Sequence, residues 1–323
     1  MKDELKMWIV RGFLLLVAMG VILAYRLGAI LPDSLWSRVP RWKFEKSPQG
    51  SLRGVVYYPE RPLALRTTPT QMGEAKGDRL HVGDSVEVVD EMRDPEGCLW
   101  AKLETQSGKT GWVRRSQLRL QMVDYTQEEQ LEYFLEIALG GEFRFVSPQI
   151  RKWLEPVRIQ VYGNPTPQDR QTLREVLCDL NGVTGEVQLS LVEDKPNVRL
   201  YFVPESDFAR YEPNYRPVNY GFFWVQWDDR HRITQAKILI STEGINQQER
   251  SHLIREEITQ SLGLMQDSYR DQRSIFYQPW TTTTEYADID WALIELLYYP
   301  QVLPGMTRSQ LLQILRKPDK TLE

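Results

Sequence analysis

The sequence predicts a multidomain chain with an N-terminal transmembrane helix, a small all-β barrel and a larger α+β domain. Three observations lead to this order: an uncharged apolar run near the N-terminus, short alternating runs separated by Gly, Asp and Pro, and a second half that mixes helical and strand-like patterns. The predicted parts are an anchor, a linker, the barrel, a connecting helix and the α+β domain, at residues 1–31, 32–52, 53–121, 122–145 and 146–323.

The composition is that of an ordinary folded protein. The chain has 323 residues, of which 41% are hydrophobic, and 40 basic against 44 acidic residues give a net charge of -4. This balance gives no reason to expect nucleic acid as a partner. Cys98 and Cys178 fall in different predicted domains, so we expect no disulfide between them, and two thiols cannot form a metal cluster. We interpret each as a small core residue.

The N-terminal apolar segment is the predicted membrane anchor. Gly12 to Tyr25 carries no charge but would span only about 21 Å as a helix, against a hydrocarbon core of about 30 Å. The longer stretch from Met7 to Leu31 suffices if Arg11 and Arg26 extend to the interfaces. A cleavable signal peptide is the alternative. No small-x-small cleavage site follows, so we favour a retained single-pass anchor that contacts membrane lipid.

The charges around this segment leave its orientation open. Basic residues precede it from Lys2 to Arg11 and follow it from Arg26 to Lys43, which does not support the usual arrangement with the N-terminus inside. We expect the soluble part to lie outside the cytoplasm. The linker at 32–52 is either a basic segment that touches anionic lipid or a plain solvated tether.

The predicted barrel has short strand-like runs between frequent turn signals. The alternation of Ser85 to Val88 is typical of a half-buried strand. Leu65-Arg66 before Pro69, Gly83-Asp84 entering a strand, Trp100 at a strand start and Gly111 to Val113 near the end follow one another in the order found in bacterial SH3 domains. The segment resembles that family over nearly its whole length.

This resemblance implies a binding module, often for cell-wall peptides or for protein partners. Trp100 and Trp112 are the aromatic residues that could contact such a ligand. A tryptophan in so small a barrel is more often part of the core, and we favour that interpretation for both.

The segment from residue 122 onward alternates helices and strands, which is typical of an α+β fold. Thr126 to Leu139 has helical spacing and acidic residues in its first turn, so we interpret it as a connecting helix. Val157 to Gly163 is a predicted strand, and Thr166 and Pro167 open a helix that runs to about Leu180. The remaining elements are the strand-like runs VQLSLVE, NVRLYFVP, YGFFWVQWD and ITQAKILIST and the helices from about Asn246 to Leu262 and from Glu285 to Tyr298, the last with a capping box of Thr282 and Glu285.

The helix after ITQAKILIST carries the main clue to function. Zincin peptidases place two histidines one helical turn apart on one metal ion, with a glutamate as general base beside the first. Metzincins add a glycine that ends the helix and a third histidine. Over this pattern Glu256, Gln260 and Gln266 take the histidine positions, Glu257 takes the base position and Gly263 takes the glycine position.

Further features resemble the metzincins. Ser274 to Tyr277 is similar to the Met-turn segment, with Phe276 at the methionine position, and TTTTEYADIDWALIELLYYP is similar to the closing helix of matrixin-like members. The resemblance covers roughly Val157 to Pro300. It indicates an uncharacterised metzincin-like family of unknown function with a degenerate zinc motif, and such a likeness of fold does not by itself confer activity.

The substituted positions predict no zinc cofactor. Gln260 and Gln266 offer neutral amide oxygens, which are poor replacements for imidazole, although Glu256 is an acceptable ligand. Weak binding of calcium or magnesium, helped by Asp267 and Asp271, remains the minor alternative. His252 lies one turn before Glu256 and is the best candidate for an unorthodox ligand, but we expect a solvated surface histidine.

Two functions from different classes remain open. The first is a binding or scaffolding protein of the cell envelope, whose barrel engages cell wall or protein and whose inactive cleft binds an extended chain along a sheet edge supplied by Tyr220 to Trp227. A buried strand is the simpler view of that segment. The second is a divergent metal-dependent hydrolase with Glu257 as general base. We favour the first, and with it a protein that is not an enzyme.

Overall fold

The structure is a computed structural model that describes residues 52–56, 63–81, 84–120, 125–140, 148–213, 215, 217 and 219–316. The chain divides into two units, 1–45 and 46–323, and all described residues belong to the second. The predicted anchor and all but the last residue of the predicted linker therefore lie outside the described residues. Within the described ranges, no helix combines the length and the apolar character needed to cross a membrane.

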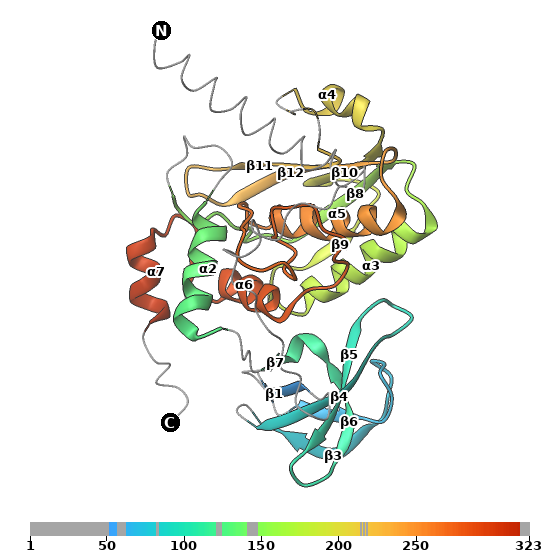
Figure 1. Ribbon diagram of the computed structural model, residues 1–323, viewed down its shortest axis with the longest axis vertical. Coiled ribbons are helices and arrows are strands. Elements are labelled where there is room, and N and C mark those ends of the chain that lie inside the picture. Colours follow the sequence, from blue (N-terminus) through green and yellow to red (C-terminus); the bar gives the residue numbers. More distant parts are fainter. Residues whose placement is uncertain are drawn as a thin grey trace, which may run out of the picture. The chain divides into compact units, whose positions relative to one another are not determined.

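The first part of this unit is a seven-stranded antiparallel sheet with the order β3-β2-β6-β5-β4-β1-β7 (Figure 1). Its core contains Val86 and Val88, which confirms the alternation expected there. The strands coincide with the predicted barrel, while the SH3 type stays a prediction. Their bounds are β1 Leu52–Val56, β2 Leu63–Arg66, β3 Ala75–Leu80, β4 Ser85–Arg93, β5 Leu99–Thr105, β6 Thr110–Arg114 and β7 Leu118–Leu120.

Both tryptophans of the predicted ligand site are buried. Trp100 and Trp112 cluster with Cys98, and the Trp100 indole Nε1 donates to Asp94 Oδ2 at 2.8 Å. A tryptophan whose indole N–H is hydrogen-bonded inside the protein is typical of a buried residue. Both residues are therefore buried, as favoured from the sequence, but in a small cluster against Cys178 that is separate from the main core of the barrel.

The expectation of two separate cysteines is wrong. Cys98 and Cys178 form a disulfide, with their Cα atoms 5.2 Å apart and 80 positions apart in sequence. The expectation failed because it treated the barrel and the next domain as independent. In fact the loop before β5 packs on the last turns of α3 (Pro167–Asn181), so closely that a Cβ on Gly97 would lie 3.1 Å from the Glu175 backbone.

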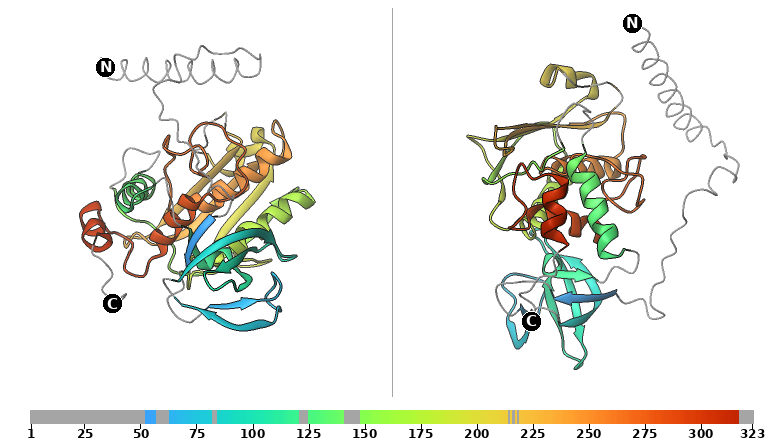
Figure 2. Two further views of the ribbon diagram at one scale, coloured as in Figure 1. Left: turned by 60° about the horizontal axis from the view of Figure 1, so that its bottom comes forward. Right: turned by 90° about the vertical axis from the view of Figure 1, so that its left-hand side faces the viewer.

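The α+β part is built on a five-stranded sheet of order β11-β12-β10-β8-β9, parallel except for β11 at one edge. Helices α3 and α5 (Gln247–Gln260) pack side by side on one face (Figures 1 and 2). A smaller apolar cluster that includes Phe208 of α4 (Phe208–Tyr211) is separate from the main core. The strand bounds are β8 Val157–Gly163, β9 Leu189–Leu191, β10 Val198–Val203, β11 Gly221–Trp227 and β12 Ile233–Ser241.

The predicted connecting helix belongs to this core. In α2 (Gln127–Leu139), Thr126 and Glu129 form the capping box at the N-terminus, and the apolar side chains join the same cluster as the sheet. Helix α2 lies between α6 (Asp288–Tyr298) and α7 (Arg308–Leu315) (Figure 1). It is therefore a structural helix of the α+β part and not a connector.

The last long helix begins later than expected. Its first turn is closed by Asp290, whose carboxylate accepts from the Ala287 backbone N–H at 2.8 Å, and not by Thr282 with Glu285. The predicted capping box is wrong because Glu285 is engaged elsewhere, by Arg93 of β4 at 2.5 Å. Arg93 of the barrel therefore binds the Glu285 carboxylate that the sequence had assigned to the helix cap.

Candidate functional site

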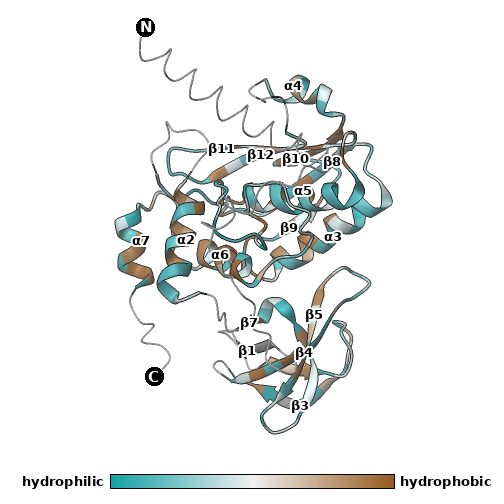
Figure 3. Ribbon diagram, viewed as in Figure 1, coloured by the Kyte–Doolittle hydropathy of each residue, from teal (hydrophilic) through white to brown (hydrophobic). Residues whose placement is uncertain are grey.

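Helix α5 is a polar helix that the fold buries. Asn246 caps it through a hydrogen bond from the Glu249 N–H, directly after strand β12 and a short loop. Figure 3 shows α5 largely in hydrophilic colours, yet ten of its residues are buried, among them Arg255, Glu257 and Gln260. Buried polar side chains must find partners inside the protein. The partners of these side chains define the candidate site.

On one face of α5, the buried His252 pairs with the half-buried Glu256. His252 is only 3% exposed, so the expected surface position is wrong: the irregular segment at Thr283 lies against the ring. Nδ1 lies 2.7 Å from the Thr283 carbonyl and Nε2 lies 3.2 Å from Glu256 Oε2. Both neighbours are acceptors, so the arrangement is satisfied when both ring nitrogens carry protons. Burial opposes this charge, but Glu256 and the Thr283 carbonyl outweigh it and raise the pKa of His252.

The two glutamines at the other histidine positions are also engaged. Gln260 is buried and its Nε2 donates to Asp267 Oδ1 at 2.5 Å. Gln266 donates from Nε2 to the Asp267 backbone carbonyl at 3.1 Å. The three residues therefore belong to two polar groups, Glu256 with His252 and the two glutamines with Asp267, and the charge of Asp267 also acts on His252.

These residues do not fit a zinc ion. The amide groups of Gln260 and Gln266 act as donors toward Asp267, and the Glu256 carboxylate faces the His252 ring. Asp271, the other carboxylate considered for a harder ion, is held by Arg273 and by the Tyr125 hydroxyl at 3.1 Å. Across the described ranges, no group of three His, Cys, Asp or Glu side chains is arranged to hold a metal ion.

Glu257, at the general-base position, lies against the first residue of the edge strand. A Cβ built on Gly221 would overlap Glu257 Oε1 and would lie 2.8 Å from Leu253 Cδ2. Glu257 is itself buried. Glycine at 221 is therefore what allows the carboxylate of α5 to approach the backbone of β11.

Two other segments singled out by the resemblance have well-defined local geometry. Gly263 follows the end of α5 with φ of +124°, a conformation that favours glycine, and any Cβ there would overlap the Arg151 carbonyl. Ser274 to Tyr277 form a tight turn closed by a hydrogen bond from the Tyr277 N–H to the Ser274 carbonyl, with Phe276 fully buried. Asp290 holds this turn by accepting from the Ser274 hydroxyl at 2.6 Å and the Ile275 N–H at 3.0 Å.

Asp290 has the most strongly shifted pKa among the acidic side chains near the site. Burial raises its pKa to about 7, although hydrogen bonds from Ser274, Ile275 and Ala287 lower it. Three donors on one carboxylate give a clear structural reason for its position. Asp290 therefore anchors this turn to the start of α6 rather than facing a ligand.

A buried ion network, which the sequence analysis missed, links α5 to the barrel. Asp179 of α3 receives hydrogen bonds from Arg93 at 3.0 and 2.7 Å and from Arg255 at 2.9 Å. Glu285 completes the set at 2.5 Å from Arg93 and 3.8 Å from Arg255. Arg255 shares the helix face of Ile258 and Leu262, and a cation within such an apolar stripe was the signal that could have found the network.

The fold and the site define an α+β protein in which a buried polar helix follows a sheet strand and carries no metal-binding set among the residues described. Residues 127–317, more than half of the chain, match the family described as Protein of unknown function (DUF2927), and the chain belongs to that family. The matched region runs from α2 to α7 and excludes the barrel.

Other comparisons add little. No curated protein matches the chain. A solved structure titled "Structure of myroilysin" is 12% identical, with 46% of this chain and 95% of that chain covered and a TM-score of 0.31. At this TM-score the likeness establishes neither the fold nor the function of the chain.

Proposed function

We propose that this chain is a membrane-anchored, extracytoplasmic binding protein whose peptidase-like domain holds an extended polypeptide without cleaving it. One observation carries the proposal. The side chains at the metal-ligand positions of the resembled motif are tied to His252 and Asp267, while the adjacent strand β11 is a sheet edge. A chain that keeps the helix and the sheet edge but commits these groups internally retains an edge for binding and loses metal-dependent hydrolysis.

The edge strand has the geometry for strand addition. The Ser241 N–H donates to the Tyr220 carbonyl, so alternate residues from Tyr220 onward face β12. The backbone groups of Phe223 and Val225 therefore face outward, and no described strand pairs with that side. Main-chain hydrogen bonds to such an edge bind an extended peptide with little dependence on its sequence. β11 is half-buried rather than the fully buried strand considered from the sequence.

Localisation outside the cytoplasm rests on two observations. The disulfide between Cys98 and Cys178 suits an oxidising compartment. The uncharged run from Gly12 to Tyr25 suits an anchor in the membrane, which remains part of the proposal because it lies outside the described residues. The barrel, by its resemblance to bacterial SH3 domains, is a second binding module for cell-wall peptide or protein.

The experiment compares binding and cleavage in the full chain. Metal content is measured by elemental analysis, and a library of extended peptides is assayed for binding and for cleavage with the parent and Glu257→Ala. We expect binding by both proteins and cleavage by neither. Stoichiometric metal together with cleavage that disappears in Glu257→Ala would overturn the proposal in favour of a hydrolase.

The edge itself is tested by one backbone change. Phe223→Pro removes an outward N–H and leaves the hydrogen bonds to β12 in place, because proline is tolerated on sheet edges. Phe223→Ala removes the same side chain and keeps the N–H. We expect Phe223→Pro to lose peptide binding and Phe223→Ala to retain most of it; equal losses would show that the side chain, not the edge, binds the peptide.

A further inference from the structure

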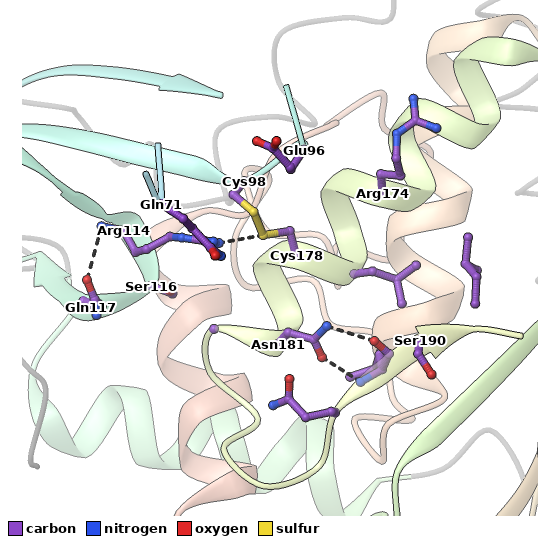
Figure 4. A pocket seen from close by; sticks show the side chains of 15 residues that line it. Gln71, Glu96, Cys98, Arg114, Ser116, Gln117, Arg174, Cys178, Asn181 and Ser190 are labelled. Atoms are coloured by element: carbon purple, nitrogen blue, oxygen red, sulfur yellow. Dashed lines mark hydrogen bonds between the residues drawn. A yellow bond between two sulfur atoms is a disulfide. The ribbon is translucent and has the colours of Figure 1, made fainter. Parts of the chain in front are cut away.

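A cavity of about 580 Å³ lies between the barrel and the opposite edge of the α+β sheet. The disulfide of Cys98 and Cys178 lines it, together with Arg114 of β6, Asn181 of α3 and Leu191 of β9 (Figure 4). The matched family region does not account for it alone, because six of its fifteen lining residues come from the barrel, and the proposed binding at β11 does not account for it because β9 is at the other end of the sheet. Its volume is that of an ordinary ligand site.

Arg114 is a cation in this cavity without a carboxylate partner among the described residues. Its Nη1 lies 2.7 Å from Cys178 Sγ, and its guanidinium lies over the Trp100 ring at 5.2 Å. Three carboxylates act on its charge: Asp94 accepts from the Cys98 N–H and Trp100, Asp179 accepts from Arg93 and Arg255, and Glu96 is exposed and forms no ion pair with a described residue. A half-buried guanidinium fixed by stacking and left without an anion is a binding group for one.

The charges around the cavity favour the same ligand. Arg174 also lines it and makes its hydrogen bond to the neutral amide of Gln171. Glu96, which is exposed, is the one acidic residue of the lining. Amide and hydroxyl groups supply most of the remaining polar lining, from Gln71, Ser116, Gln117, Asn181, Gln188 and Ser190.

Strand β9 offers a backbone edge in the same cavity. The Val157 N–H donates to the Gln188 carbonyl and the Val192 N–H to the Ile159 carbonyl, so the backbone groups of Leu189 and Leu191 face away from β8. The Asn181 side chain occupies the outer side of Leu189, accepting from its N–H at 2.6 Å and donating to its carbonyl at 2.9 Å. This amide pairs with β9 as a peptide group of a further strand would.

The next outward position on β9 is open. No described strand pairs with the outer side of β9, and the Leu191 side chain is 48% exposed. We propose that the cavity binds an acidic peptide in extended conformation, which pairs with β9 at Leu191 beyond Asn181 and places a carboxylate side chain against Arg114. The barrel supplies the charge that selects the peptide, and the sheet supplies the edge that orders its backbone.

The test uses the full chain and fluorescein-labelled, end-capped hexapeptide libraries in which one position is fixed as Glu or as Gln. Fluorescence polarisation is expected to show binding of Glu libraries at least tenfold tighter than of the matched Gln libraries. Arg114→Gln should remove this preference. Arg79→Gln, an exposed arginine of β3 outside the cavity, should preserve it.

A second pair of variants tests the edge. Leu191→Pro removes the outward N–H and should weaken binding of the Glu libraries roughly tenfold, whereas Leu191→Ala should leave it nearly unchanged. Phe223→Pro should have no effect here, which separates this site from the one proposed at β11. Equal binding of Glu and Gln libraries, an unchanged preference in Arg114→Gln, or competition by free glutamate at the affinity of the peptide would each overturn the proposal.

Discussion

The buried ion network makes Asp179 the residue whose neutralisation should cost the most stability. Asp179→Asn keeps the shape of the side chain and removes its charge. Arg255, which is 0% exposed, would then have Glu285 at 3.8 Å as its nearest carboxylate. Removing one partner of a buried ion pair costs about 3–5 kcal/mol because the other charge stays desolvated. We expect a loss of stability in that range.

The assay is urea unfolding of the full chain, followed by tryptophan fluorescence. Asp194→Asn, at an exposed position, is the control and should change stability by less than about 0.5 kcal/mol. Adding Arg255→Met to Asp179→Asn should recover part of the lost unfolding free energy, because the buried, unpaired charge of Arg255 is then also removed. A loss below about 1 kcal/mol for Asp179→Asn would refute the reasoning, since Arg255 would then be solvated or paired in another way.

Three further predictions concern the site and the disulfide. The pKa of His252 is raised in the folded state, so the contribution of its charge to stability should be complete below the unfolded pKa of about 6.5 and lost as the pH rises through the folded pKa. The difference in unfolding free energy between the parent and His252→Gln should therefore shrink from pH 6 to pH 9. A difference that stays constant over this range would contradict the prediction. Gly221→Ala should destabilise by about 1–3 kcal/mol through overlap with Glu257, and the combination with Glu257→Ala should relieve part of that cost in a double-mutant cycle. Replacing Cys98 and Cys178 together by serine should cost about 2–4 kcal/mol in urea unfolding, and reductant should cost the parent a similar amount while leaving the double variant unchanged.

Local patterns predicted most of the elements. The strand Val157 to Gly163 was predicted with its observed bounds, since alternation and the Asn-Pro turn after it are local signals. The caps at Thr126, Thr166 and Asn246 or the residues beside them likewise marked the starts of helices. Gly263 was placed at the end of α5 by the resemblance to the metzincin motif, and its positive φ shows why glycine suits that position.

The remaining features depend on contacts between distant segments. His252 is buried by Thr283, 31 positions away, and Cys98 meets Cys178 across 80 positions. The sequence placed Glu285 in a capping box, but in the structure Glu285 pairs with Arg93, which lies 192 positions earlier. The contacts of Cys98 and Arg93 depend on how two predicted domains pack against each other, and that of His252 depends on how a distant segment of its own domain packs. Single-sequence periodicity carries no information about either kind of packing.

The two hydrogen bonds from Arg93 to Asp179 also show that the matched family region and the compact structural unit do not share a boundary. The family match begins at residue 127, yet the guanidinium that shields Asp179 from the rest of the interior comes from β4, well upstream. A fragment cut at that boundary would lose the cation together with the cystine bridge. The barrel is thus a structural component of its neighbour, and an expression fragment that is meant to preserve helix α5 must include it.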